Sequence, residues 1–129
     1  MYRNMKMQLK EILVLNDVLK AIIDNDKDLK IDVLFKFKLL GIMKSIEIPV
    51  ENFDIIRKEK IKQYGKKDED GNISIPNNDH DTIKKFTEDL NKVIISDVEV
   101  NIEKISAKDA FCAGVPAEYL VKLYSIIEE

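Results

Sequence analysis

The chain has 129 residues, 45% of them hydrophobic, so it is long enough for one packed core and too short to expect two domains. Its 21 basic and 24 acidic residues are interspersed and leave a formal net charge of -3, which excludes a global bias toward nucleic acid or an anionic membrane. Charged residues break the apolar runs, the first residues lack the apolar segment of a signal peptide, and the only cysteine is Cys112. We expect a cytosolic protein in a reducing compartment.

The first predicted element is a helix from Met5 to about Asp24. Its apolar residues recur at spacings of four and three, as on one face of a helix; they include Met5, Leu9, Ile12, Leu19 and Ile23. Asn16 lies in the middle of this row. A buried Asn can fix the register of a helix pair in a dimer, or it can make a local contact inside a monomer. The sequence leaves both interpretations of Asn16 open.

A second helix is predicted from Asp28 to Ile48, and we expect it to form a hairpin with the first. Its apolar set is Val33, Leu34, Phe35, Phe37, Leu39, Leu40, Ile42, Met43 and Ile46. Pro49 lacks a backbone donor and disfavours helix at the residue before it, so the helix should break or kink there and restart near Val50. Gly65 is predicted as the left-handed residue that ends the third helix.

The third helix carries only a thin apolar row among many charged residues. Such a row buries little surface, so we predict a projecting or pairing helix. The candidate partner surface consists of Phe53, Ile56, Lys60, Ile61 and Tyr64.

Short β-like runs follow Gly65. Asp70 and Gly71 predict a turn, Ile73 and Ile75 alternate as in a half-buried strand, and we expect this strand to pair with residues 98–102. Three helices are predicted in this part of the chain: one after the cap cluster 77–81, a short one from Ser106 to Gly114, and one from Pro116 to Ile127.

These elements predict a mostly helical α+β fold of one domain. An N-terminal helical hairpin and a kinked third helix make a helical arm, residues 1–65. A two-stranded antiparallel element and the C-terminal helices make a smaller α+β part, residues 66–129.

Two acidic segments fail as calcium loops. The first, with Asp24, Asp26 and Asp28, has Leu29 where the loop needs glycine, and the second has Lys66 at its first position. We interpret both as solvated turns with local bonds between side chains and backbone.

Two further segments carry candidate chemistry. Asp79, His80 and Asp81 could hold a metal ion weakly, but Asp and Asn are also preferred caps for the following helix, which is the interpretation we favour. Cys112 lies in an apolar turn and is expected to be a small buried thiol. No phosphate loop or nucleophile elbow is present, so we expect neither an enzyme nor a bound cofactor.

The basic cluster along residues 57–67 is the best sequence argument for nucleic acid. It consists of Arg57, Lys58, Lys60, Lys62, Lys66 and Lys67. Several cations on one helix could neutralise phosphates, but Glu59 interrupts the cluster and no interleaved aromatic residue offers a stacking surface. A solvated helix face is therefore the favoured interpretation.

Residues 5–45 and the turn segment 64–72 (YGKKDEDGN) resemble small proteins of unknown function from tailed phages of Gram-positive, particularly staphylococcal, bacteria. The resemblance implies a viral origin, expression in the host bacterial cytoplasm and an accessory role, and it implies no catalytic residues. Our leading hypothesis is a non-enzymatic phage accessory or assembly protein that contacts a phage or host protein through its helical arm. A nucleic-acid-associated or host-directed regulator and a weak metal-dependent enzyme around Asp79 and Asp81 are the alternatives.

Overall fold

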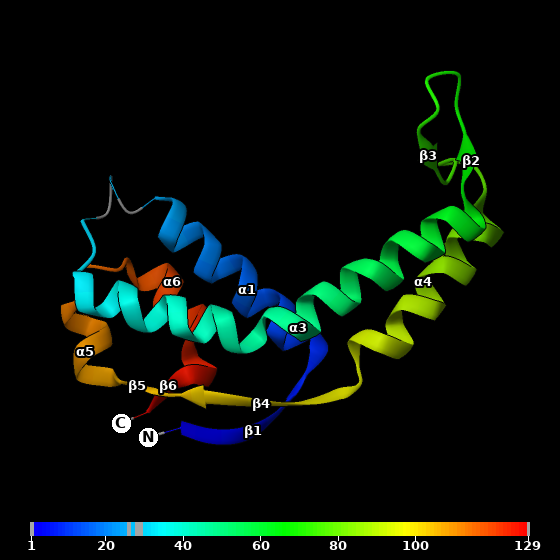
Figure 1. The fold of residues 1–129 in the computed structure, drawn as a ribbon. Helices are drawn as coiled ribbons and strands as arrows, with labels where there is room; N and C mark the ends of the chain where they lie inside the picture. The colour runs from blue at the N-terminus through cyan, green and yellow to red at the C-terminus, as the bar shows by residue number, and fades with distance from the viewer. Residues whose placement is uncertain (1, 26, 28–29, 129) are drawn as a thin grey trace.

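The fold has a body and a projecting arm, which can be followed in Figure 1. The computed structural model describes residues 2–25, 27 and 30–128. The body holds the first helix, the first half of the longest helix, a two-stranded sheet and the C-terminal helices. The arm consists of the second half of the longest helix, a small β-hairpin at its tip and a helix that returns beside it.

The N-terminal segment is a strand and not the start of a helix. β1 (Tyr2–Gln8) pairs antiparallel with β4 (Asp97–Glu103). Met5 and Met7 alternate with polar residues at the two-residue period of a strand, and Met7 is buried. The helix predicted from Met5 therefore begins later, as α1 (Leu9–Asp24).

The core lies between α1, the first half of α3 (Val33–Tyr64), β4 and the C-terminal segment. Its largest fully buried side chains are Ile12, Leu15, Leu19, Ile22, Leu39, Ile46, Ile102, Ile105, Leu123 and Ile126. Because α1 and α3 pack on each other within this core, the predicted helical hairpin is confirmed. The predicted helix start at Asp28 lies outside the described residues, and α3 begins after the cap Asp32.

α3 continues as one helix across Pro49, and Figure 1 shows its axis changing direction near the middle. Proline lacks the N–H that would bond the carbonyl of Ser45, and its ring crowds that carbonyl, which explains the change of direction. The predicted kink is thus confirmed. The predicted third helix, however, is not a separate element but the second half of α3, residues 50–64, which runs along the arm.

The end of α3 differs from the prediction. Gly65 has φ -83° and ψ 167°, so it is extended and not left-handed. Its N–H donates to the carbonyl of Ile61 at 2.7 Å. A Cβ at this position would collide with that carbonyl and with Cγ2 of Ile73. Close packing at the base of the hairpin, and not a positive φ, therefore explains the glycine.

A short hairpin forms the tip of the arm, with β2 (Lys66–Lys67) antiparallel to β3 (Ile73–Ser74). The Asp68 carboxylate accepts hydrogen bonds from the backbone N–H groups of Asp70 and Asn72, both at 2.9 Å. These bonds confirm the predicted turn with local side-chain contacts. The predicted pairing of β3 with β4 is wrong, because this turn brings β3 back to β2 and β4 pairs with β1.

The three helices predicted in the second part of the chain are all present. They are α4 (His80–Ile94), α5 (Ala107–Cys112) and α6 (Ala117–Lys122). The last is shorter than predicted, because the chain turns at Leu123 into η1 (Tyr124–Ile126) and then extends as β6 (Ile127–Glu128). β6 pairs in parallel with β5 (Ile105–Ser106).

The mostly helical α+β fold is confirmed by these elements. The predicted division at residue 65 does not describe the arrangement in space. The hydrophobic core joins α1 and α3 to β4, α5 and α6, and the arm combines the second half of α3 with α4. Residues from both predicted parts therefore build the body and the arm alike.

Candidate interaction surface

The side of α3 that we predicted as a partner surface faces α4 of the same chain. The Tyr64 hydroxyl donates to Oδ2 of Asp89 on α4 at 2.6 Å, and Lys60 Nζ lies 3.4 Å from the same oxygen and 5.9 Å from the centre of the Tyr64 ring. The hydrogen bond from Tyr64, followed by the proximity of Lys60, holds the pKa of Asp89 below its usual value, and Asp89 raises the pKa of Tyr64. This cluster fastens the two helices of the arm together.

The remaining members of the predicted surface are also engaged within the chain. Phe53 is half-buried and packs against the core. Ile56 lines, with Phe53, Pro49 and Val98, a hollow of about 470 Å³ between α3, the end of α4 and β4. Ile61 is half-buried. The structure thus covers part of each of these side chains with the protein itself.

Asn16 is not a buried residue of the core. It is partly exposed on α1 and lines two shallow hollows on the side of α1 that faces α3, next to Val50 and Glu51. The buried face of α1 is formed by its neighbours Ile12, Leu15 and Leu19. The premise of a buried Asn is therefore wrong, and a register role of Asn16 stays a prediction.

Half of the predicted basic cluster is paired with carboxylates. Asp54 lies 3.0 Å from Arg57 and 2.8 Å from Lys58, and Lys60 pairs with Asp89. The pKa of Asp54 is held below its usual value by hydrogen bonds, first from Lys58 and then from Arg57. These contacts reduce the positive charge that this part of α3 could offer to phosphates.

The segment around His80 is a helix start. The Asp79 carboxylate accepts a hydrogen bond from the Thr82 N–H at 3.3 Å, which lowers the pKa of Asp79 and confirms the capping interpretation. Among the residues that the structure describes, no group of three or more His, Cys, Asp or Glu is arranged to hold a metal ion.

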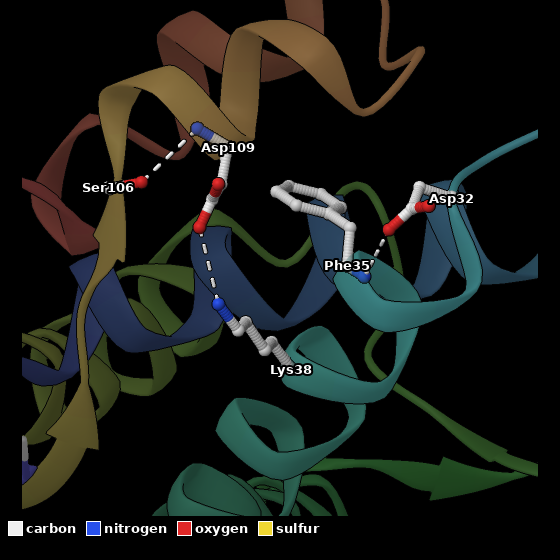
Figure 2. A network of polar contacts seen from close by, with 5 residues as sticks. All are labelled: Asp32, Phe35, Lys38, Ser106 and Asp109. Atoms are coloured by element: carbon white, nitrogen blue, oxygen red, sulfur yellow. Dashed lines mark hydrogen bonds and ion pairs between the residues drawn. The ribbon is translucent and has the colours of Figure 1, made fainter.

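A second polar network, shown in Figure 2, joins α3 to α5. Lys38 Nζ lies 3.3 Å from Oδ2 of Asp109, Ser106 Oγ accepts from the Asp109 N–H at 3.2 Å, and Asp32 caps α3 by accepting from the Phe35 N–H at 3.1 Å. The hydrogen bond of Ser106, and then Lys38, keep the pKa of Asp109 below its usual value. The two caps stabilise the starts of α3 and α5, and the ion pair between Lys38 and Asp109 joins the two helices.

The same region corrects the prediction for Cys112. This residue is exposed and lines a hollow of about 290 Å³ with Asp32, Lys38 and Asp109. The small buried residues at this turn are instead Ala110 and Ala113. The apolar character of this turn is thus explained by the burial of Ala110 and Ala113, while the thiol of Cys112 is exposed.

A row of exposed apolar side chains lies on the outer face of α3, away from its buried side. Large apolar side chains recur there at helical spacing and are strongly exposed: Val33 (79%), Phe37 (75%), Leu40 (45%), Ile48 (68%) and Ile55 (55%). Lys44 and Glu51 occupy the two intervening positions, and both are exposed. Together these seven residues form what we call the outer row.

Sequence reasoning missed the outer row as a surface. It assigned Phe37 and Leu40 to one apolar set with Phe35 and Leu39, although that set covers more of the helix than one buried face can hold. Counting the positions would have shown that the helix is apolar on two faces. The extension to Ile55 also required a helix that continues through Pro49.

No family model, curated protein or solved structure matches this chain. In the part of the chain that the structure describes, every helix is too short or too polar to span a membrane. The outer row is therefore interpreted from its own chemistry, and the resemblance to phage proteins stays a prediction.

Proposed function

We propose that this chain is a non-enzymatic interaction protein that binds another polypeptide through the outer row of α3. The observation that carries the proposal is the alignment of five exposed, large apolar side chains on one helix face, from Val33 to Ile55. At 1.5 Å per residue, these 22 steps extend over about 33 Å of helix. Single exposed apolar residues are ordinary, but a continuous row is typical of a helix that packs against a partner.

The rest of the helix shows why the row is available to a partner. Phe35, Leu39, Ile42 and Ile46 already supply the buried face of α3, so the outer row is not needed for the core. Phe37 is large, aromatic and three-quarters exposed, which suits it to act as an anchor in a partner's pocket.

The biological setting that we propose is a phage accessory or assembly factor in the bacterial cytoplasm, and it rests on the resemblance of residues 5–45 and 64–72 to small phage proteins. The nucleic-acid and metal alternatives are not favoured by any contact of the described residues. The basic cluster is half paired with carboxylates, and Asp79 is a helix cap.

A matched pair of variants tests the proposal. Phe37→Glu places a charge on the outer row, and Val121→Glu does the same on α6 at a position that is also 75% exposed. A tagged chain is produced together with an untagged copy in the bacterial host, with and without infection, and the proteins it retains are quantified. Circular dichroism checks that both variants fold.

We expect Phe37→Glu to lose about tenfold or more of the bound polypeptide, because an anchor residue commonly contributes 1.4 kcal/mol or more, roughly a factor of ten. Val121→Glu should bind like the wild type. Equal retention of every polypeptide by the two folded variants would contradict the proposal. The untagged copy is identified separately, so that binding to a second copy and binding to another protein are distinguished.

A further inference from the structure

The central part of the outer row has a charge pattern that is complementary to itself when the helix is reversed. Along α3 the order is Leu40, Lys44, Ile48, Glu51, Ile55, all exposed. Ile48 stands at the centre, the two charges of opposite sign flank it, and an aliphatic residue ends each side. Lys44 and Leu40 lie four and eight residues before Ile48. Glu51 and Ile55 lie three and seven residues after it.

An antiparallel second copy, related by a two-fold axis at Ile48, would match this pattern. Lys44 would face Glu51 of the other copy twice, and Leu40 would face Ile55 twice. The steps on the two sides differ by one residue, which is about 1.5 Å of helix rise and is within the reach of Lys and Glu side chains. A parallel arrangement would instead place Lys44 against Lys44 and Glu51 against Glu51, which is repulsive.

Lys44 and Glu51 are both exposed, and they interact with each other and with Glu47 on the same helix. The Lys44 side chain is 82% exposed, and its Nζ lies 2.9 Å from a carboxylate oxygen of Glu47 on the same helix. An exposed pair of this kind contributes little to stability, so reorienting Lys44 toward a second copy opposes only a weak interaction.

From this charge complementarity we infer that the outer row binds a second copy of the chain, antiparallel and centred on Ile48, with two Lys44–Glu51 pairs across the interface. The inference rests on the proposed function, because it names the partner of the same surface. An isologous contact of this kind closes as a dimer over Leu40 to Ile55. Val33 and Phe37, at the N-terminal end of the outer row, lie outside the paired stretch.

Charge-swap variants test the arrangement. Lys44→Glu and Glu51→Lys are prepared singly, as a mixture of the two chains, and as one doubly substituted chain. Lys122→Glu and Glu118→Lys, two exposed positions on α6, are the controls of equal charge change. Sedimentation equilibrium over a wide range of protein concentration gives the dimer dissociation constant.

The wild type and both controls are expected to dimerise. Each single substitution should weaken the dimer by about tenfold or more, because it creates two like-charged contacts. The mixture of the two single variants should restore the dimer as a heterodimer, and the double variant should restore the homodimer. The double variant also separates the two orientations. In a parallel pair, positions 44 and 51 would each face the same position of the second copy, so the like-charged contacts of the single variants would persist in the double variant.

A wild type that remains monomeric at every concentration would overturn the inference, as would single variants that dimerise like their controls or a double variant that is not restored. If the chain is monomeric while Phe37→Glu still loses another polypeptide that Val121→Glu retains, the second copy is wrong and the proposed interaction function stands. If the chain is monomeric and Phe37→Glu retains the same polypeptides as Val121→Glu, both the inferred dimer and the proposed function are wrong.

Discussion

At the scale of single residues, replacing glycine by alanine should have opposite effects on stability at Gly65, at the end of α3, and at Gly41, within α3. A Cβ at Gly65 would collide with the backbone carbonyl of Ile61 and with Ile73, whereas a Cβ at Gly41 would have no neighbour within 4 Å. Gly65→Ala should therefore lower the free energy of unfolding by about 1–3 kcal/mol, the usual range for overpacking. Gly41→Ala should raise it by about 1 kcal/mol, because glycine is a poor residue in the middle of a helix.

Chemical denaturation of the two variants and the wild type measures these changes. Since both variants replace glycine by alanine, they differ in surroundings and not in the residue introduced. A Gly65→Ala variant as stable as Gly41→Ala would show that the close approach at the base of the hairpin is incorrect.

The Tyr64–Asp89 hydrogen bond predicts a pH dependence. Because the pKa of Asp89 is lowered in the folded state, its contribution to stability is present above its unfolded pKa and is lost as the pH falls through the folded value. The pKa of Tyr64 is raised, so its contribution is present below its unfolded pKa and is lost as the pH rises through the folded value.

Tyr64→Phe removes the hydroxyl that donates to Asp89. We expect the pKa of Asp89 to rise toward its usual value, as followed by NMR titration of the carboxyl group. Tyr124→Phe, at a tyrosine that is 81% exposed, is the control and should leave Asp89 unchanged. An Asp89 pKa that is the same in Tyr64→Phe and the wild type would show that the hydrogen bond is not formed.

At the scale of elements, the helix starts depend on local caps. Ser106 accepts a hydrogen bond from the Asp109 N–H at the start of α5, and Asp109 in turn pairs with Lys38 of α3. Ser106→Ala should lower the free energy of unfolding by about 1 kcal/mol. Thermal denaturation measures the change, with Ser74→Ala on the exposed β3 as control. A variant as stable as this control would mean that the cap does not support α5.

Local signals explain which elements could be predicted. The caps Asp79 and Ser106 act within three residues, and the amphipathic pattern of α4 is complete within the helix, so both can be found in the sequence. Strand pairing is different. β1 pairs with β4 some ninety residues later, and nothing in Met5 or Met7 alone specifies that partner. The contact between Tyr64 and Asp89 joins two helices in the same non-local way.

At the scale of the whole molecule, a well-packed body carries an exposed apolar helix face. The core is complete without the outer row, and the arm is fastened by α4 and the cluster of Lys60, Tyr64 and Asp89. The outer row extends along α3 from the body past Pro49 and into the arm. Its apolar residues are therefore interpreted as a binding surface that the folded chain presents, not as a defect of packing.

Cross-linking from position 48 tests whether the outer row binds a protein. In a Cys112→Ser background, Ile48→Cys and Ile95→Cys each receive a thiol-linked photo-crosslinker; Ile48 is 68% exposed on the outer row, and Ile95 is 61% exposed after α4. After irradiation of the purified chain and of extracts of bacterial cells, we predict a discrete cross-linked polypeptide from position 48 and only weak, non-specific products from position 95. Equal cross-linking from the two positions, or none from position 48, would contradict the claim that the outer row binds a protein.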